Sequence, residues 1–345
     1  MGKKEYLEML NNIEQGEDSP KLNKHDRTLI IDGLNLFLRN FAVLNFINEK
    51  GVHVGGLAGF LRSLGSLIKQ IQPTSVYIVF DGVGSSDNRK SLHPEYKSGR
   101  NYKVTNWDVF ENLEDEQDAK IDQITRLIQY LKCLPVKVIS LPKTEADDVI
   151  SHLSQTLDKK YNSRVVIVSS DKDFLQLINK NIVVYRPIER DFYDIKTVTD
   201  KFGVPPHNFL FYKTLVGDQS DKIPGVKGIG KNNVIKKFPE LAGPQLVLDD
   251  IFNICESKLK QNISYARALM EWDNIEKYYK IMDLQNPLLN EKEKEFIEEK
   301  IKEKIASLRI LDFLSLYDED GLNHIIKNTE FWVKDNFANL KIYDA

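Results

Sequence analysis

The chain has 345 residues and a net charge of −3 at neutral pH; 41% of its residues are hydrophobic and 29% are charged. This composition is typical of a globular protein with one large domain or two smaller ones, and the small net charge argues against indiscriminate binding to nucleic acid. No apolar run approaches the roughly 20 residues of a membrane helix, and the polar N-terminus lacks a signal-peptide core, so we expect a cytoplasmic protein that makes no membrane contact.

The first half of the chain alternates between predicted strands and predicted helices. After a polar stretch at 1–26, which we expect to be a flexible extension, short apolar runs predict buried strands at 28–31, 76–80, 136–139 and 165–168. Apolar residues at helical spacing predict helices over 54–71, 121–134 and 147–157. This alternation indicates an α/β domain, which we place at 27–200, with a mostly parallel central sheet flanked by helices.

Residues 82–120 interrupt the alternation, because they are far longer than an ordinary connection in a compact domain. Between Ser85 and Lys103 there are five Lys or Arg residues against two acids, whereas 107–118 holds six acids in a pattern compatible with a helix. Long insertions of this kind are usually functional or disordered. We interpret 82–120 as a mobile lid or helical arch; a solvated loop and helix without a role is the alternative.

Beyond about residue 200 the pattern becomes helical, and we assign 201–345 to a helical subdomain. Three glycines, Gly225, Gly228 and Gly230, fall between two helical patterns and predict a tight helix-turn-helix at about 210–240. Backbone N–H groups at such a turn favour binding to phosphate groups, and so do the five lysines of 222–237, which has no acid. The tail after about 260 is predicted to be helical, and its Glu- and Lys-rich segment 291–304 indicates a solvated helix face.

The two cysteines, Cys133 and Cys255, lie far apart in the sequence, and each falls within a helical pattern. Disulfide frameworks and zinc sites usually show paired cysteines or closely spaced Cys and His residues. We therefore expect two buried thiols without a functional role.

Nine acidic residues fall at the predicted strand ends or beside the helix-turn-helix. In a parallel α/β sheet, ligands bind beyond the carboxyl ends of the strands, so acids that follow separate strands meet at one edge. Carboxylates repel one another, and a fold that gathers them normally does so to hold divalent cations. The nine residues are Asp32, Asp81, Glu145, Asp147, Asp148, Asp171, Asp173, Asp218 and Asp221.

Each of these acids has a structural explanation when it is taken alone. Thr144 with Asp147, and Ser170 with Asp173, resemble capping boxes in which Asp replaces the usual Glu. Asp32 and Asp81 could cap strand ends, and the acids of the loop could be solvated. The complete set favours the metal site, because these independent explanations would have to coincide at every strand end.

The residue types at this edge favour particular ions and a particular reaction. Carboxylate oxygens without His or Cys partners favour Mg²⁺ or Mn²⁺ over zinc. So many carboxylates make two ions more plausible than one, and two ions about 4 Å apart can activate a water and stabilise the leaving oxygen of a phosphodiester. The two basic segments, 85–103 and 222–237, supply the positive charge that a phosphodiester substrate needs. Together these features predict a metal-dependent phosphodiester hydrolase.

At this point the motifs resemble those of a known family, the 5′ nucleases: flap endonucleases and 5′→3′ exonucleases that remove RNA primers and flaps. The resemblance is closest to the stand-alone phage type, and it covers roughly 28–240. The matching segments occur in the family's order. They are Ile31-Asp32-Gly33, Phe80-Asp81-Gly82, His93-Pro94-Glu95-Tyr96-Lys97 with Arg100, Glu145-Ala146-Asp147-Asp148, Ser169-Ser170-Asp171-Lys172-Asp173, and Gly217-Asp218 through Gly225-Val226-Lys227-Gly228-Ile229-Gly230.

The resemblance implies a role for each matching acid. Asp81, Glu145 and Asp147, with Asp32 nearby, would hold the first metal, and Asp81 and Asp147 count among the catalytic residues. Asp171, Asp173 and Asp218 would hold the second metal, and Asp148 and Asp221 would be outer ligands that act partly through water.

The resemblance also implies how the substrate is held. Lys97 and Arg100, at the base of the arch, would contact the scissile phosphate, and Arg89 and Tyr96 belong to the same DNA-binding segment. Tyr96 could pack within the arch or stack near a base. In the helix-turn-helix, Gly225, Gly228, Gly230, Lys227 and Lys231 match residues that grip the duplex backbone, and the carbonyls of this turn would hold K⁺. Leu38, flanked by Phe37 and Phe41, occupies the position at which the family has a stacking aromatic.

Our leading hypothesis is a Mg²⁺-dependent 5′ nuclease that cleaves near a duplex junction and leaves a 5′ phosphate. Its expected substrates are DNA with a 5′ flap or 5′ end and RNA:DNA hybrids, and replication proteins such as a single-stranded DNA-binding protein or a clamp are expected partners of a monomer. A DNA-binding protein that has lost catalysis predicts a missing ligand, and none of the nine is missing. A related ribonuclease that acts only on RNA explains the acids but not the helix-turn-helix.

Overall fold

The structure is a computed structural model that describes residues 23–98 and 103–340. The predicted flexible extension at 1–26 and the predicted phosphate contact Arg100 lie largely or wholly outside these residues. Within the described part of the chain, every helix is too short or too polar to cross a membrane. Both thiols, Cys133 and Cys255, are free and buried, as the sequence predicts.

A six-stranded sheet forms the centre of the molecule, with the strand order β3-β2-β1-β4-β5-β6. All neighbouring strands are parallel except β5 and β6, which are antiparallel. The four predicted strands are present with boundaries within one residue of the apolar runs, and β5 and β6 add to them. The strands are β1 (Arg27–Asp32), β2 (Ser75–Phe80), β3 (Lys137–Ser140), β4 (Arg164–Val168), β5 (Ile182–Arg186) and β6 (Asp191–Tyr193).

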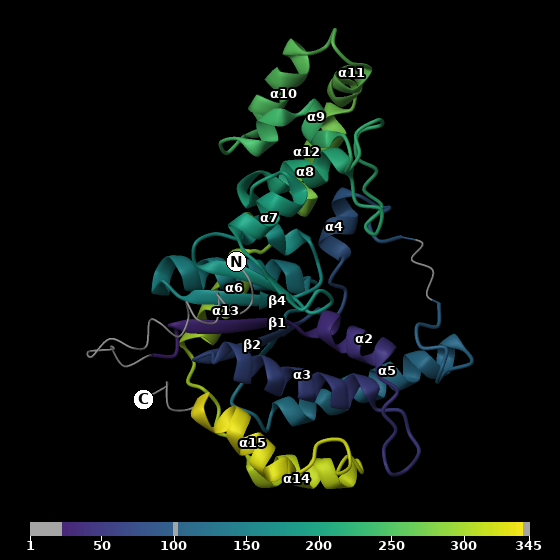
Figure 1. The fold of residues 1–345 in the computed structure, drawn as a ribbon, viewed down its shortest axis with the longest axis vertical. Helices are drawn as coiled ribbons and strands as arrows, with labels where there is room; N and C mark the ends of the chain where they lie inside the picture. Colours follow the sequence, from purple (N-terminus) through teal and green to yellow (C-terminus); the bar gives the residue numbers. More distant parts are fainter. Residues whose placement is uncertain (1–22, 99–102, 341–345) are drawn as a thin grey trace.

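Helices cover both faces of the sheet, which confirms the predicted α/β class (Figure 1). The direction of each β1 side chain shows the two layers: Ile30 packs in one buried core with Val149 and Leu153 of α6, whereas Leu29 and Ile31 pack in a second core with α3. The covering helices are α2 (Gly33–Val43), α3 (Gly55–Ile71), α5 (Leu113–Leu131) and α6 (Ala146–Tyr161). The sheet is therefore buried on both faces, and its strand ends are left as the place for a site.

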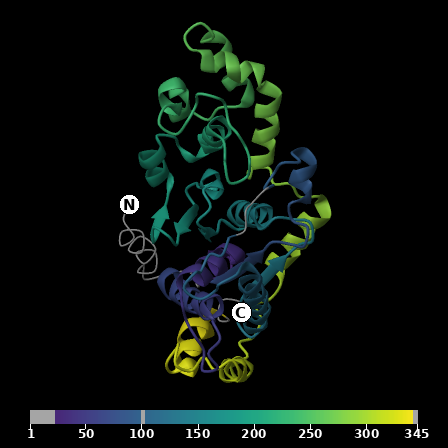
Figure 2. The same cartoon turned by 90° about the vertical axis from the view of Figure 1, so that its right-hand side faces the viewer.

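The helices after the sheet extend the molecule in two directions. Figures 1 and 2 place α10 and α11 at one end of the long axis and α14 and α15 at the other. The chain thus leaves the sheet through α7–α12 and then returns to it, because α13 packs on α6 and α15 packs on α3. These helices are α7 (Ile195–Phe202), α8 (Phe209–Val216), α9 (Val234–Lys237), α10 (Leu248–Ser257), α11 (Ile263–Met270), α12 (Trp272–Met282), α13 (Glu291–Lys302), α14 (Ile310–Glu319) and α15 (Thr329–Phe337).

The two halves of the predicted arch differ in structure. The basic half contains the short helix α4 (Asp87–Leu92), whereas 103–112 is irregular and leads into α5. Glu116 of α5 is fully buried, and its carboxylate accepts hydrogen bonds from the backbone N–H groups of Thr105 and Asn106 and from the ammonium of Lys120. Burial raises the pKa of Glu116, but these donors outweigh burial and lower the pKa to about 2. The acid-rich half is therefore anchored to the body of the protein.

Candidate metal centre

The parallel strands deliver the predicted acids to one edge of the sheet. Asp32 is the last residue of β1 and Asp81 follows β2. Asp147 lies in the first turn of α6, which follows β3, and Asp171 follows β4. Because β3, β2, β1 and β4 are neighbours in this order, residues that follow these strands come together at the carboxyl edge.

Asp32, Asp147 and Asp171 form the first group of carboxylates, which we call the open cluster. Burial raises the pKa of Asp32 to about 7, and the charges of Asp81 and Asp171 add to this effect. Burial, and then the charges of Asp171 and Asp32, raise the pKa of Asp147 well above its usual range. Burial is the largest cause for both residues, repulsion between carboxylates adds to it, and the charge of Lys97 offsets part of it at Asp147. A divalent ion would offset the rest.

Local hydrogen bonds fix the open cluster. Asp32 caps α2, because its carboxylate accepts a hydrogen bond from the backbone N–H of Asn35 at 3.1 Å, and it also accepts one from the Ser169 hydroxyl at 2.9 Å. The carboxylate of Asp81 accepts a hydrogen bond from the backbone N–H of Ala146 at 2.9 Å. Asp32 therefore has a structural role as the cap of a helix, rather than of the strand end as expected, and this does not exclude a ligand role because oxygen lone pairs remain.

Asp173, Asp218 and Asp221 form the second group, in which one oxygen of each carboxylate lies within 4.8 Å of the others. We call it the lysine-compensated cluster, because the ammonium of Lys213 contacts both Asp173 and, at 2.7 Å, Asp218. Burial raises the pKa of Asp218, but Lys213 and the hydrogen bonds from Ser220 outweigh it and hold the pKa below its usual range. A monovalent cation of the protein itself therefore occupies part of this site.

The two clusters can be compared with the sets implied by the resemblance. The resemblance implies that Asp171 holds the second metal, and in the structure its charge also acts on Asp32 and Asp147 of the open cluster. Asp221, which the resemblance implies is an outer ligand, has a carboxylate oxygen within 4.8 Å of those of Asp173 and Asp218. It lies in the loop after α8, where the backbones of Asp218 and Ile223 pair in a short bridge.

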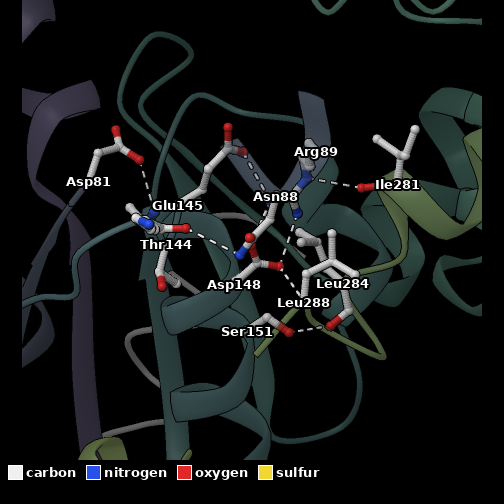
Figure 3. A network of polar contacts seen from close by, with 12 residues as sticks. Asp81, Asn88, Arg89, Thr144, Glu145, Asp148, Ser151, Ile281, Leu284 and Leu288 are labelled. Carbon is white, nitrogen blue, oxygen red and sulfur yellow. Dashed lines mark hydrogen bonds and ion pairs between the residues drawn. The ribbon is translucent and has the colours of Figure 1, made fainter. Parts of the chain in front are cut away.

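Asp148 does not fit the predicted outer ligand, and Arg89 does not fit the predicted DNA contact (Figure 3). The Arg89 guanidinium is 3% exposed and donates to both carboxylate oxygens of Asp148, at 2.5 and 2.9 Å. Asp148 also accepts a hydrogen bond from the backbone N–H of Leu288, and Arg89 donates to the carbonyl of Ile281. Both side chains are therefore buried partners that join α4, α6 and the segment after α12, and neither reaches solvent.

Glu145 lies between this buried ion pair and the open edge. Its carboxylate is 2% exposed and accepts hydrogen bonds from the Tyr96 hydroxyl at 3.1 Å and from the Lys97 ammonium at 2.8 Å, and it lies 3.1 Å from Arg89. Tyr96 is 3% exposed, so it packs in the core rather than offering a face to a base. Burial lowers the pKa of Lys97, but the charges of Glu145, Asp147 and Asp221 outweigh burial and raise it.

Two lysines that sequence reasoning missed lie beside the clusters. A cavity of about 580 Å³ is lined by Asn35, Asp171, Asp218 and three lysines, Lys172, Lys213 and Lys231. Burial lowers the pKa of Lys172, and the charge of Lys231 lowers it further, so the two ammonium groups lie near each other. Lys213 had a detectable signal, because it is a single charge inside the apolar helix Phe209–Val216.

The glycine-rich turn has a more specific structure than the sequence predicts. Gly225, at φ 65°, packs against the backbone of Val216 and Gly217, where a Cβ would lie 2.4 Å from a carbonyl carbon. The N–H of Gly230 donates to the side chain of Asn233 at 2.8 Å, so it is not free to bind phosphate. The side chains of Lys227 and Lys231 are exposed, as a contact with DNA requires.

The aromatic residues near α2 do not supply a stacking surface. Phe37 and Phe41 are both fully buried, whereas Leu38, which occupies the position of the expected aromatic, is 38% exposed.

The capping box predicted for Thr144 and Asp147 is absent, since the Thr144 hydroxyl donates to Pro142 and Glu293 instead. A structural explanation of Asp147 as a capping residue is therefore wrong.

Comparison with known proteins assigns this fold and site to a family. The sequence model described as 5′-3′ exonuclease, N-terminal resolvase-like domain, matches residues 27–203. A 5′-3′ exonuclease of Aquifex aeolicus is 30% identical over 84% of this chain and 94% of its own length, and DNA polymerase I of Bacillus subtilis is 28% identical over 70% of this chain but only 26% of its own length.

A structural comparison agrees at the level of the fold. The bacteriophage T5 D15 flap endonuclease, in a pseudo-enzyme–product complex with DNA and metal ions, superimposes with a TM-score of 0.62 and 18% identity, covering 85% of this chain and 99% of that one. The sequence match, rather than this distant structural match, decides the assignment. The chain belongs to the 5′-3′ exonuclease family.

Proposed function

We propose that this protein is a divalent-metal-dependent, structure-specific 5′ nuclease that hydrolyses phosphodiesters with two metal ions. The observation that carries the proposal is the pair of adjacent carboxylate clusters at the strand ends, one open and one compensated by Lys213. Both clusters consist of aspartates, without a His or Cys ligand among the described residues, which favours Mg²⁺ with Mn²⁺ as a substitute. When bound, the ions supply an activated water and stabilise the leaving oxygen.

The residues of the chain position the phosphodiester against this edge. Asp32, Asp147 and Asp171 hold the cation of the open cluster, with Asp81 and Glu145 beside them. Lys97, whose side chain is 22% exposed and already lies 2.8 Å from Glu145, can turn its ammonium to a phosphate at the same edge. We propose the same role for Arg100, on the matching motif alone. These cations stabilise the charge that develops on the phosphate.

The glycine-rich turn and its lysines hold the duplex. Lys227 and Lys231 are exposed, and Lys231 shares a cavity with Lys172 beside the metal clusters. Lysine contacts of this kind bind the phosphate backbone without regard to sequence, and they fix where the cut falls. We propose that carbonyls of 225–231 bind K⁺, as the resemblance implies.

A second cavity favours a branched DNA substrate, whose two arms meet at a junction, over a duplex with a simple 5′ end. It has a volume of about 490 Å³, lies between α2, α3 and the turn joining β5 to β6, and is lined by Arg39, Arg62 and Arg190 with no acidic residue. Arg39 is one helical turn beyond Asn35, which lines the first cavity, so the two cavities adjoin the same helix. A phosphate backbone there would place the junction between the arms at the clusters.

The deciding experiment is incubation with a 5′-flap duplex and Mg²⁺, with EDTA as the control. We expect cleavage near the junction that depends on the metal. A nicked duplex, an RNA:DNA hybrid and single-stranded RNA of matched sequence complete the set. Tight flap binding without cleavage would support an inactive binding protein, and cleavage of RNA alone would support a ribonuclease; either result contradicts the proposal.

The biological role follows from the substrate. Removal of RNA primers or 5′ flaps during DNA replication, in a bacterial or phage-infected cytoplasm, is the role that we propose, and bacterial relatives of the chain support it. Contacts with a single-stranded DNA-binding protein or a clamp belong to this proposal, as does action as a monomer.

A further inference from the structure

The exposed tryptophan of the 103–112 segment has no explanation in packing. Trp107 is 68% exposed, whereas its neighbour Asn106 is 3% exposed and fully hydrogen-bonded. Trp107 follows Asn106 at the start of a turn, because the backbone N–H groups of Val109 and Phe110 both donate to the carbonyl of Asn106. An indole at the top of a turn therefore faces solvent on an otherwise anchored segment.

Both flanks of Trp107 are fixed to α2. On one side, the Asn106 side chain donates to the carbonyl of Phe41 at 3.1 Å and to the Asn45 side chain at 3.0 Å. On the other side, Asn45 donates to Asp108, and the Phe110 ring stacks on Phe41 with centroids 5.5 Å apart and an interplanar angle of 10°. The indole is thus presented by a rigid platform, which reduces the entropy lost when a ligand stacks on it.

The position of Trp107 along α2 relates it to the open cluster. Asp32 caps the start of α2, and Phe41 lies nine residues later, which corresponds to about 13 Å along the helix axis. Successive nucleotides of a DNA strand advance about 3.4 Å along the axis when stacked and roughly twice as far when extended, so this distance corresponds to roughly two to four nucleotides. A strand whose phosphate lies at the clusters can therefore bring a nearby base to Trp107.

The charges around Trp107 orient such a strand. Residues 108–118 carry five acids besides the buried Glu116, and these repel phosphates, whereas the exposed Lys103 and the half-buried Arg39 of α2 attract them. A strand that passes here turns its backbone away from the acidic segment and its bases toward it. Base faces stack on indole rings without regard to sequence, but only in single strands whose bases are not already stacked in a duplex.

We propose that Trp107 is a stacking platform for the single-stranded 5′ arm, where it holds a base two to four nucleotides from the cut. The inference rests on the proposed function. Trp107 is a positioning residue: it touches the substrate away from the reacting atoms and fixes the register of the strand. It therefore acts on substrates with a 5′ arm of several nucleotides and leaves a single-nucleotide arm unaffected.

The test compares Trp107→Ala and Trp107→Phe with the wild type on two flap substrates, measured in EDTA so that binding is separated from cleavage. One flap has a single nucleotide and the other about six, within the usual range of single-strand site sizes. Loss of a stacking contact lowers affinity about 5- to 150-fold, and we expect Trp107→Ala to weaken binding of the longer flap toward the lower end of this range. Trp107→Phe should restore most of it.

The fluorescence of 2-aminopurine at successive flap positions reports the stacked base directly. We expect quenching two to four nucleotides from the junction in the wild type and in Trp107→Phe, and loss of this quenching in Trp107→Ala. Phe331→Ala, which removes an equally exposed aromatic on α15 (70% exposed), is the matched control and should change neither readout.

Three results would overturn the inference: equal affinity of Trp107→Ala and wild type for the longer flap, an equal loss for both flaps, or quenching that persists in Trp107→Ala. An equal loss for both flaps would place Trp107 against the duplex instead. If the wild type neither binds nor cleaves the flap substrates, the proposed function itself fails, which is distinguishable from a failure of Trp107 alone.

Discussion

The two carboxylate clusters are built from the same residue type, yet their electrostatics are opposite. In the open cluster, burial and mutual repulsion raise the pKa of Asp32 to about 7 and that of Asp147 well above its usual range. In the lysine-compensated cluster, Lys213 holds the pKa of Asp218 below its usual range. The difference comes mainly from the Lys213 ammonium of α8, with hydrogen bonds from Ser220 adding to it.

This difference separates two kinds of cation site. A divalent ion that enters the open cluster relieves repulsion and displaces only protons, whereas an ion that enters the other cluster competes with Lys213. We therefore expect the open cluster to fill first. The buried pair of Arg89 and Asp148 is a third case, because there the protein itself neutralises the carboxylate completely with a buried guanidinium.

Asp147→Ala should remove a ligand of the open cluster and slow cleavage by about a thousandfold or more. Binding of flap DNA should change little, because the proposed phosphate contacts lie elsewhere. Single-turnover cleavage together with a binding titration measures both quantities. Asp87→Ala, an exposed acid of α4, is the control; cleavage by Asp147→Ala at the control's rate would refute the open cluster as the first metal site.

Arg89→Met should destabilise the fold by about 3–5 kcal/mol, because it leaves the buried carboxylate of Asp148 without its partner. Urea unfolding measures the loss. In the double variant Arg89→Met with Asp148→Leu, which has no unpaired charge, much of the stability should return. If Arg89→Met has the stability of the wild type but binds DNA weakly, Arg89 is instead a DNA contact.

Lys213→Met should lower stability by about 1–3 kcal/mol without metal, since Asp173 and Asp218 lose their shared donor. Saturating Mg²⁺ should recover most of this loss, because a divalent ion binds only the folded site and replaces the ammonium. Thermal unfolding in EDTA and in Mg²⁺ gives the comparison, with the exposed Lys227→Met as the control. An equal loss under both conditions would show that Lys213 does not occupy a cation site.

The pH dependence of stability should report the open cluster. The folded-state pKa of Asp32, about 7, lies above its ordinary value of 3.8. Between these two values the folded state holds a proton that the unfolded state has lost, so stability falls as pH rises. In EDTA we expect a loss of about 1 kcal/mol between roughly pH 6 and pH 8. This step should shrink in Asp32→Asn, where the raised pKa of Asp147 can still contribute, and should shrink or reverse in Mg²⁺; an unchanged step in Asp32→Asn would assign it to another group.

Lys231→Ala should give the smallest effect, because it removes one phosphate contact. Affinity for duplex DNA should fall a few-fold regardless of sequence, and the slope of log affinity against log salt should decrease by about one. Lys180→Ala is the matched control, since this exposed lysine precedes β5 and so lies at the opposite edge of the sheet. Equal salt slopes for the two variants would contradict the role of Lys231.

Local sequence patterns are enough to predict most of the sheet and the acids that follow its strands. The runs that became β1 to β4 are continuously apolar because both faces of the sheet are covered, and this pattern needs no partner to be read. β5 and β6 were missed because the alternation ends there: a short 3-10 turn, Asp173–Leu177, replaces a helix between β4 and β5. The acids of 107–118 are compatible with a helix, but α5 begins only at Leu113, and 107–112 is irregular because its contacts are tertiary.

The residue types at the carboxyl ends of the strands can be read from the sequence alone, because strand direction and the order of motifs are local properties of the chain. How those residues divide into clusters depends on tertiary contacts. The groupings of Asp171 with Asp32 and of Lys213 with Asp218, and the burial of Arg89 against Asp148, each depend on contacts between segments that fold next to one another. The sequence shows which residues are charged, but whether those charges are compensated depends on distances and burial that only the folded chain sets.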